Sequence, residues 1–407
     1  MRRAFSCGNY PRFQIEPWQT EIIWYNKGNE YRREPFMKVT DVKTFLVFAE
    51  RQNWIFVKVL TDEGIYGWGE ASIEGLELMV DAAIHVLAQR SVIGEDPRNV
   101  DYVWQKMYRH GFWKSGFVYQ SAISGIDMAL WDIKGKALGV PVYELLGGKV
   151  RDRIRTYTHG GPELAAEIIA KGFAGVKTGT VPEEVGDDRY GAAKKFAAKL
   201  DAIRRIIGDD HIIAIDHHGD STPRDAMSLL EAAKDYDLHF FEEPIPPENS
   251  GLYGKLIGNP YNVPIAAGER LYSRYDYREV ISDRLLDVIQ PDICHCGGIS
   301  EIRKIAYMAE PYLIKFAPHN PNGPVATAAT IQVCAAMQNF DILEFSQATY
   351  ARESLYDIDL KPVDGYFKIS DRPGLGVELD EEAFAAYPFR DYQYPARYRK
   401  DGSAAEQ

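Results

Sequence analysis

The chain has 407 residues, 45% hydrophobic and 26% charged, which is the composition of a globular protein long enough for two domains. Its formal net charge of −12 argues against nonspecific binding to nucleic acid or to an anionic membrane. Four cysteines in so long a chain do not make a disulfide framework, and no apolar run reaches the length of a membrane span, so we expect a cytoplasmic protein.

Residues 1–36 contain aromatic side chains such as Trp18 and Trp24 but show no sustained hydrophobic period. They are either an arm that packs on a neighbouring subunit or a leader outside the folded domain. We favour the leader, because disorder concentrates at chain termini. We therefore expect an N-terminal extension over residues 1–36 and a folded domain that starts at Met37.

Residues 37–150 change from a strand pattern to a helix pattern. Polar and apolar residues alternate over residues 39–69, and a turn at residues 62–64 predicts two joined strands. Over residues 76–138 apolar residues recur at spacings of three and four, which indicates helices. Strands followed by helices predict an α+β capping domain over residues 37–150.

Short apolar runs alternate with amphipathic helices over residues 151–370. Parallel strands joined by right-handed crossovers explain this alternation, and closure into a barrel leaves no exposed edge. We predict a (β/α)7β barrel of the TIM type, with an open doubly wound sheet as the alternative. Residues 371–407 are expected to return and pack on the capping domain. The eight predicted strands are RIRTYTHG, FAGVKTG, HIIAIDHHG, HFFEEP, VPIAAGE, LLDVIQPD, YLIKFAPH and FDILEFS.

A polar residue ends each predicted barrel strand from the second onward. From Asp216 to Glu344 these residues follow one another at intervals of 23 to 27 residues, the length of one strand-helix unit. The strand ends of a parallel barrel face one mouth, so these side chains are expected to converge. They are Lys177, Asp216, Glu242, Glu269, Asp292, His319 and Glu344.

Asp216, Glu242 and Glu269 are carboxylates on three adjacent predicted strands. Unpaired, they would repel one another and raise each other's pKa values, so a divalent cation is the natural partner. Ligation by oxygen alone favours Mg²⁺ and leaves positions for water or substrate. We predict one Mg²⁺ per subunit at this site; a salt-bridge cluster with Lys177 and Arg270 is the alternative.

Histidines complete the predicted site. A carboxylate that binds one imidazole nitrogen fixes the tautomer and frees the other nitrogen, so Asp292 and His319 are a candidate base pair. Side chains alternate along a strand, so Asp216 and His218 should share the barrel mouth, with His218 as proton donor, while His217 packs under the helices. His159, at the end of the first barrel strand, is either a substrate contact or a packing residue.

These motifs resemble the enolase superfamily, mandelate racemase subgroup. GVKTG, IDHHG, FFEEP, AAGER, QPDICHCGGISE, FAPHNPNGP and ILEFS resemble its barrel; GWGEAS, SAISGIDMALWDIKGKALGVPVYELLGG and PGLGVELDE resemble its capping domain. Within the subgroup the chain is most similar to acid-sugar dehydratases of the galactonate dehydratase type. The resemblance implies a small acid-sugar substrate, a homo-oligomer, and Mg²⁺ bound by Asp216, Glu242 and Glu269.

The resemblance also implies roles for the other residues. His319, with Asp292, would abstract the C2 proton, and His218 would assist departure of the 3-hydroxyl to give a 2-keto-3-deoxy acid. Glu344 resembles the residue that hydrogen-bonds a substrate carboxylate oxygen, which requires it to be protonated or to share a proton.

One departure from the family pattern affects the expected reaction. Mandelate racemase-like members carry Lys-x-Lys on the second barrel strand, and their second lysine is a base on the opposite face of the substrate. Here Gly179 stands in its place, which disfavours racemisation, whereas elimination needs only one base and one acid. Lys177 is left to contact the substrate carboxylate or to pair Asp216 or Glu242. Two alternatives to a dehydratase remain: a racemase or epimerase of a 2-hydroxy acid, and a noncatalytic relative that binds a sugar acid.

Overall fold

The computed structural model describes residues 36–50, 52–180, 189–392, 396–398 and 402–404. The predicted extension lies outside the described residues, except for its last residue, Phe36. Among the helices so described, none combines the length and the apolar character needed to cross a bilayer.

An antiparallel sheet of three strands, in the order β1-β2-β3, begins the described chain. The turn after β2 is closed by a hydrogen bond from Gly64 N to Thr61 O (3.3 Å), and Gly64 has a φ of +75°, which glycine adopts without steric cost. The predicted pair of strands joined at residues 62–64 is thereby confirmed. The strands are β1 (Val39–Ala49), β2 (Gln52–Thr61) and β3 (Tyr66–Glu70).

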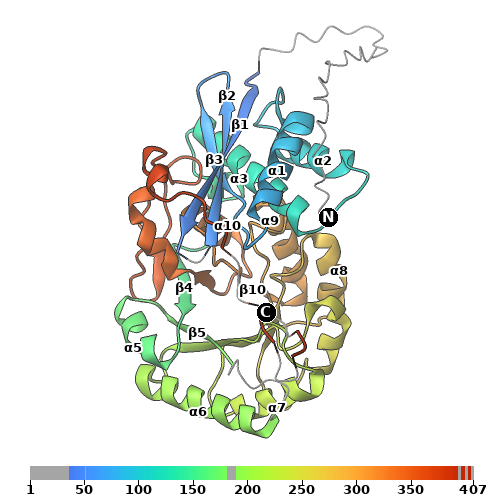
Figure 1. Ribbon diagram of the computed structural model, residues 1–407, viewed down its shortest axis with the longest axis vertical. Helices are drawn as coiled ribbons and strands as arrows, with labels where there is room; N and C mark the ends of the chain where they lie inside the picture. The colour runs from blue at the N-terminus through green and yellow to red at the C-terminus, as the bar shows by residue number, and fades with distance from the viewer. Residues whose placement is uncertain (1–35, 51, 181–188, 393–395, 399–401, 405–407) are drawn as a thin grey trace, which may run out of the picture. The chain divides into compact units, whose positions relative to one another are not determined.

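Helices follow this sheet, as the change in hydrophobic period predicted. In Figure 1, α1, α2 and α3 lie at the end of the molecule away from α6 (Arg189–Ile207) and α7 (Pro223–Ala233). The longest, α3, also contacts the barrel, where Trp131 Nε1 donates to Ser300 Oγ (2.9 Å). The helices are α1 (Glu77–Leu87) with a π-helical continuation (Ala88–Val92), α2 (Val100–His110), α3 (Phe117–Leu138) and α4 (Val142–Leu145).

Two glycines of β3 allow α3 to approach the sheet backbone to backbone. A Cβ atom at Gly67 would lie 2.1 Å from Ala129 O, and one at Gly69 would lie 1.9 Å from Gly125 O. Nonbonded atoms cannot approach so closely, so any larger residue would push the helix away from the sheet.

Gly69→Ala is expected to lower the free energy of unfolding by about 3 kcal/mol, the upper part of the usual range for overpacking a core. Urea denaturation of the variant and the wild type measures the difference. Gly251→Ala is the matched control, because its Cβ would lie 3.5 Å from Asn249 Oδ1, an ordinary contact. A Gly69→Ala protein as stable as the control would contradict the close approach of α3.

Eight parallel strands form the barrel in the described part of the chain, as predicted. Strands β4 to β10 are paired in chain order, and β11 pairs with β4. Phe316 N donates to Asn339 O and Asp341 N donates to Phe316 O, each at 2.9 Å, so β10 meets the residues just before β11 and the sheet closes. The strands are β4 (Arg153–His159), β5 (Gly175–Gly179), β6 (Ile212–Asp216), β7 (Phe240–Glu242), β8 (Ile265–Ala267), β9 (Val288–Ile289), β10 (Lys315–Phe316) and β11 (Leu343–Phe345).

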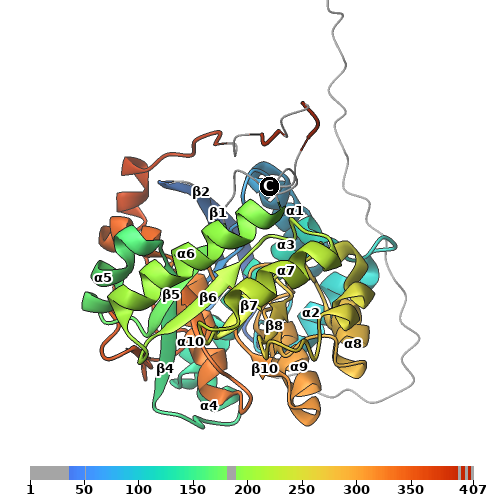
Figure 2. The same ribbon diagram turned by 90° about the horizontal axis from the view of Figure 1, so that it is seen from below.

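Each connection between successive barrel strands carries a helix, which confirms the predicted (β/α)7β architecture. Figure 2 shows α5, α6, α7 and α8 outside the strands. Pro162, Pro223 and Pro324 begin three of the helices, where the missing N–H of proline has no helical partner to lose. The helices are α5 (Pro162–Ala170), α6 (Arg189–Ile207), α7 (Pro223–Ala233), the 3-10 helix η2 (Pro247–Lys255), α8 (Arg274–Ser282), α9 (Ile299–Ala309) with the 3-10 turn η3 (Glu310–Tyr312), and α10 (Pro324–Ala336).

The chain after the barrel returns to the N-terminal sheet. Phe384 packs its ring against Phe45 and Trp68 at centroid distances of 5.2 and 6.3 Å, and Leu375 N donates to Asp132 Oδ1 of α3 (2.8 Å). The predicted boundaries at residues 150 and 370 stay predictions, since residues 37–407 form one unit. The elements here are η4 (Gln347–Leu355), β12 (Tyr366–Lys368) and η5 (Glu382–Ala386).

Strand β12 was not predicted from the sequence. It pairs antiparallel with β4, with Phe367 opposite Ile154. Three residues are too few to show the alternation by which a strand is recognised in sequence.

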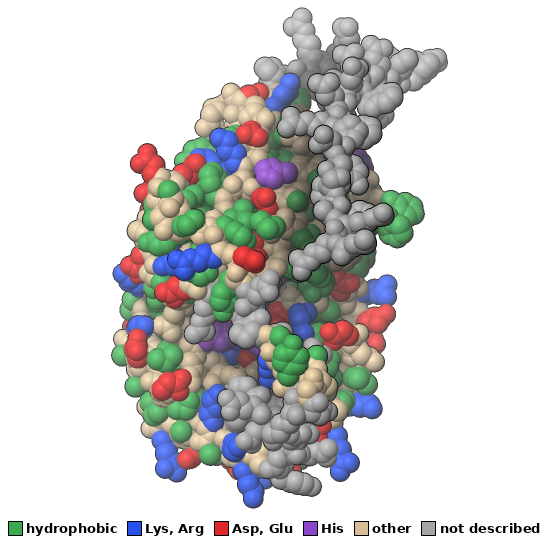
Figure 3. Space-filling model, viewed as in Figure 1, with side chains coloured by type: hydrophobic (Ala, Val, Ile, Leu, Met, Phe, Trp, Pro, Cys, Tyr) green, Lys and Arg blue, Asp and Glu red, His purple; other side chains and the backbone are tan. Residues whose placement is uncertain are grey.

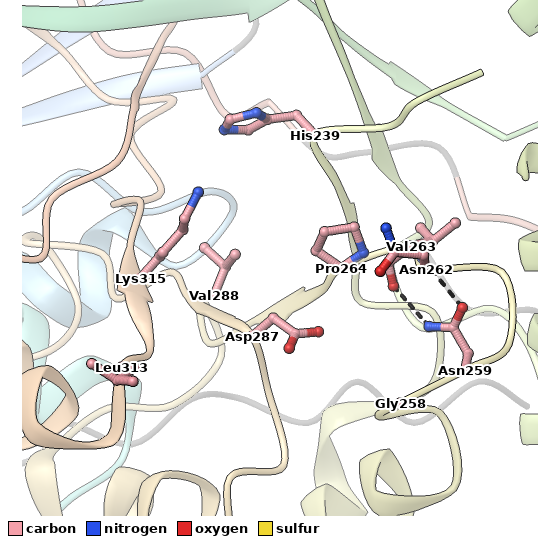
Figure 4. Close-up of a pocket in the computed structure, with 10 residues that line it drawn as sticks. All are labelled: His239, Gly258, Asn259, Asn262, Val263, Pro264, Asp287, Val288, Leu313 and Lys315. Carbon is pink, nitrogen blue, oxygen red and sulfur yellow. Dashed lines mark hydrogen bonds between the residues drawn. The ribbon is translucent and has the colours of Figure 1, made fainter. Parts of the chain in front are cut away.

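Buried side chains fill the barrel interior, among them Tyr157, Phe240 and Val288. A cavity of about 290 Å³ lies at the amino ends of the strands, lined by His239 and Lys315 among other residues (Figure 4). None of the predicted site residues lines this cavity. The strand-end side chains therefore lie at the other face of a packed barrel.

Acidic and basic side chains are interspersed on the face of the molecule shown in Figure 3. Nucleic acids bind to surfaces on which basic side chains are gathered.

Candidate active site

The predicted site residues lie at or just beyond the carboxyl ends of the barrel strands. Strand register places His159 beside Lys177 and Asp216 beside Glu242. Ion-pair contacts of 4.0 Å or less connect the seven predicted strand-end residues, together with His159 and His218, into one group. The structure thus brings together side chains that are far apart in the sequence, while their chemical roles stay predictions.

Lys177 lies fully buried among three carboxylates. Its Nζ is 2.7 Å from Glu242 Oε2, 3.1 Å from Glu344 Oε1 and 3.3 Å from Asp216 Oδ2. Burial lowers the pKa of this amine, but the three carboxylates outweigh burial and raise the pKa well above its usual range. The lysine is therefore charged and pairs with these carboxylates, while its predicted contact with a substrate carboxylate stays a prediction.

Glu344 is surrounded by basic groups and accepts a hydrogen bond from one backbone N–H. His159 Nε2 contacts its Oε1, and Asn320 N donates to Oε2 (3.2 Å). Burial raises the pKa of this carboxyl, but Lys177, His319 and His159 outweigh burial and lower the pKa below its usual range. This differs from the protonated form that the resemblance implied, and His159 is the group with which Glu344 can share a proton.

His319 and Asp292 form a hydrogen-bonded pair, with His319 Nδ1 2.8 Å from Asp292 Oδ2. A proton on Nδ1 is donated to the buried carboxylate of Asp292. The other nitrogen, Nε2, then faces Glu269, whose Oε2 is 3.2 Å away. Burial lowers the pKa of this imidazole. Glu269, Glu344 and Asp292 outweigh burial and raise the pKa well above its usual range.

Asp292 is fixed by two further donors, which were not singled out from the sequence. Asn322 Nδ2 donates to both carboxylate oxygens (3.1 and 2.9 Å), and Cys294 N donates to Oδ1 (2.6 Å). Burial raises the pKa of this carboxyl, but His295, His319 and Asn322 outweigh burial and lower it. The only sequence signal for Asn322 was its place in FAPHNPNGP, three residues after His319.

The two histidines after β6 point in different directions. His218 Nε2 lies 3.1 Å from Asp216 Oδ2, whereas the buried ring of His217 contacts Thr180 Oγ1 and Ser221 Oγ, each at 2.6 Å. The predicted separation is observed, but strand alternation is the wrong reason for it. Strand β6 ends at Asp216, and His218 has a φ of +51°, so a left-handed turn brings it back beside Asp216.

The carboxylates predicted to bind a metal ion carry unsatisfied oxygens. Glu242 Oε1 and Glu269 Oε2 are buried without a hydrogen-bond partner. Burial raises the pKa of Glu269 well above its usual range, because nearby carboxylates add to burial and outweigh the opposing effect of His319. Within the described ranges, no three His, Cys, Asp or Glu side chains are grouped as ligands of one metal ion. The all-oxygen set, in which Glu242 Oε1 has no partner, nevertheless fits the donor preference of Mg²⁺.

Two family models match most of the chain. One, described as enolase C-terminal domain-like, matches residues 162–383, and the other, the mandelate racemase / muconate lactonizing enzyme N-terminal domain, matches residues 31–147. The D-galactonate dehydratase of Variovorax paradoxus is 40% identical and that of Xanthomonas axonopodis pv. citri is 41% identical. Each alignment covers 91% of this chain and 100% of the relative.

Solved structures agree with this match. An enolase from Agrobacterium radiobacter, with sodium and L-malate bound, has a TM-score of 0.85 at 33% identity and covers 91% of this chain and 100% of its own. An enolase superfamily member from Salmonella Typhimurium has a TM-score of 0.81 at 32% identity, over 87% of this chain and 99% of its own. The resemblance seen in the sequence is confirmed: the chain belongs to the mandelate racemase / muconate lactonizing enzyme family of the enolase superfamily.

Proposed function

We propose that the chain is a Mg²⁺-dependent dehydratase of a sugar acid, of the galactonate dehydratase type. The observation that carries the proposal is a pair of imidazoles, each beside its own carboxylate: His319 with Asp292, and His218 with Asp216. Elimination of water needs one group that accepts a proton and another that donates one. The relatives named D-galactonate dehydratase support the same class of enzyme, a hydro-lyase.

His319 is proposed to remove the proton from C2 of the substrate. The electrons of the C–H bond pass into the substrate carboxylate and form an enediolate. These electrons then form the C2=C3 bond as the C3–O bond breaks, and the hydroxyl takes a proton from His218 and leaves as water. The resulting enol tautomerises to a 2-keto-3-deoxy acid, so the net change is the loss of one water molecule.

The surroundings of the two histidines support these roles. The hydrogen bond to Asp216 raises the pKa of His218 although burial opposes it, which keeps a proton available for donation. Asp292 holds the Nδ1 side of the His319 ring, so Nε2, 3.2 Å from Glu269 Oε2, is the nitrogen that would accept the proton. His159, whose side chain is half exposed, is proposed to meet the polar end of the substrate beside Glu344.

Asp216, Glu242 and Glu269 are the residues that would hold Mg²⁺. The buried Glu242 Oε1, which has no hydrogen-bond partner, supports this assignment. When bound, Mg²⁺ supplies positive charge that stabilises an enediolate and offsets the negative charge of Glu269 beside His319.

A screen of aldonic and aldaric acids with Mg²⁺ tests the proposed function, with 2-keto-3-deoxy acids as the measured products. Turnover of at least one acid, lost on addition of a chelator, is the expected result. Recovery of an epimerised acid would instead favour a racemase or epimerase. Binding of an acid without turnover of any member would favour the noncatalytic relative.

His218→Asn is expected to lower the rate of dehydration by about 10²-fold or more, the usual contribution of a general acid. Exchange of the C2 proton with deuterated solvent should persist, because His319 removes that proton before the hydroxyl leaves. Proton NMR in D₂O measures both reactions.

The control is His217→Asn. Its ring contacts Thr180 and Ser221 rather than the site, so dehydration per folded molecule should be retained. Equal loss of dehydration in the two variants would refute the assignment of His218 as the acid.

A further inference from the structure

We infer that Arg270 and Glu243 form a clamp that holds the turn carrying His218, and thereby position the proton donor. The inference rests on the proposed function and deepens it, because it assigns a positioning role to two residues outside the predicted site. The three residues follow successive strands: His218 follows β6, Glu243 follows β7 and Arg270 follows β8.

The backbone of the turn is unusual. His218 has a φ of +51° and Glu243 a φ of +40°, both in the left-handed region that residues with a Cβ atom enter at a cost in free energy. Gly219, next to His218, has a φ of +75°. Such conformations persist only where the surrounding structure holds them in place, and they cluster at functional sites.

Arg270 provides that restraint from one side. Its Nη2 donates to His218 O (3.0 Å), while its Nε donates to Glu243 Oε1 and Oε2 (3.2 and 3.0 Å) and its Nη2 also contacts Glu243 Oε2. The planar guanidinium fixes the directions of these donors, so one side chain links both partners with a defined geometry.

Glu243 restrains the turn from the other side. It is buried, its backbone oxygen accepts a hydrogen bond from Gly219 N (2.8 Å), and its own N donates to Ala266 O of β8 (2.9 Å). The backbone of residues 218 and 219 is therefore bound on both sides to the Glu243–Arg270 clamp.

The position of the His218 imidazole depends on this turn. Its side chain is 57% exposed, so packing restrains the ring little. The turn aims the ring, and the contact of Nε2 with Asp216 Oδ2 (3.1 Å) completes its placement. A small displacement of an acid from its leaving group lowers the rate of the step that it serves.

Arg270 could instead act only through its charge, since it follows Glu269 in a strongly acidic region. Lysine retains the charge but lacks the planar fork of donors. Arg270→Lys therefore separates the two roles: a clamp is broken by lysine, whereas a charge effect is preserved.

The dehydration and C2-exchange assays compare the wild type with three variants: Arg270→Lys, Arg270→Gln and Glu243→Gln. Calorimetry measures the Mg²⁺ affinity of each protein. Both Arg270 variants are expected to lose dehydration by about 10²-fold while keeping C2 exchange and Mg²⁺ affinity. Glu243→Gln should show the same selective loss to a smaller extent, and it provides the test if the Arg270 variants do not fold. Arg278→Gln, whose partner Glu279 is exposed, is the matched control and should behave as the wild type.

Two outcomes would overturn the clamp. Wild-type dehydration in Arg270→Lys would assign the role to charge alone. Parallel loss of exchange, dehydration and Mg²⁺ affinity would assign Arg270 to support of the metal site.

A crystal structure of Arg270→Gln tests the clamp without any substrate. We expect His218 to leave the left-handed region and its Nε2 to move away from Asp216. An unchanged turn would refute the inference even if the wild type turns over a sugar acid. A wild type inactive on every acid would refute the proposed function and leave this crystallographic test of the clamp intact.

Discussion

His319→Asn is expected to abolish exchange of the C2 proton with deuterated solvent and to lower dehydration by about 10² to 10⁴-fold, the usual contribution of a general base. Only Nε2 of His319 is placed by Asp292 to accept a proton, and asparagine offers no comparable base. Its side-chain amide retains a donor for Asp292, so the change removes basicity rather than the whole hydrogen-bond network. Loss of the C2 proton signal in D₂O, followed by NMR, measures the exchange.

His239→Asn is the matched control for this prediction. His239 also pairs with a carboxylate, since its Nε2 lies 2.9 Å from Asp341 Oδ2, but it lines the cavity at the opposite end of the barrel. This variant should exchange the C2 proton as the wild type does. Normal exchange in His319→Asn would exclude His319 as the base.

Lys177→Met is expected to lower the free energy of unfolding by about 3 to 5 kcal/mol, the range for removal of one partner from a buried ion pair. The ammonium and Glu242 are fully buried, so the substitution leaves Glu242 without its ion-pair partner and without access to water. Urea denaturation without Mg²⁺ measures the loss, because a bound cation would replace part of the missing charge.

Lys171→Met is the control for charge removal alone. Lys171, the residue after α5, pairs with Glu167; both side chains are exposed, and such a pair contributes less than about 1 kcal/mol. If Lys177→Met were no more destabilising than this control, the buried cluster would not contribute to stability as proposed.

The strand-end residues could be predicted because the barrel repeats along the chain. From Asp216 to Glu344, each strand-helix unit places one ionisable residue after a short apolar run, at intervals of 23 to 27 residues. Hydrophobic periodicity is a local property, and parallel strands in a closed barrel put their carboxyl ends on one face. The number of barrel strands followed from these patterns, whereas the family followed from the resemblance of the motifs.

The conformation after β6 could not be predicted in the same way. Alternation along a strand predicted that His218 would lie beside Asp216, yet β6 ends at Asp216 and a left-handed turn gives the same outcome. A histidine does not signal positive φ as glycine does, and the turn is held by Arg270, which is 52 residues away in the chain.

The sequence by itself determined the fold class and which residues stand at the mouth of the barrel, because both depend on local periodicity. Only the tertiary structure decided which of those residues pair. Lys177 lies between carboxylates that include Glu242, 65 residues away, and Asn322 completes the surroundings of Asp292. Such pairs depend on barrel closure and on the directions of side chains across strands, which no local pattern of residues specifies.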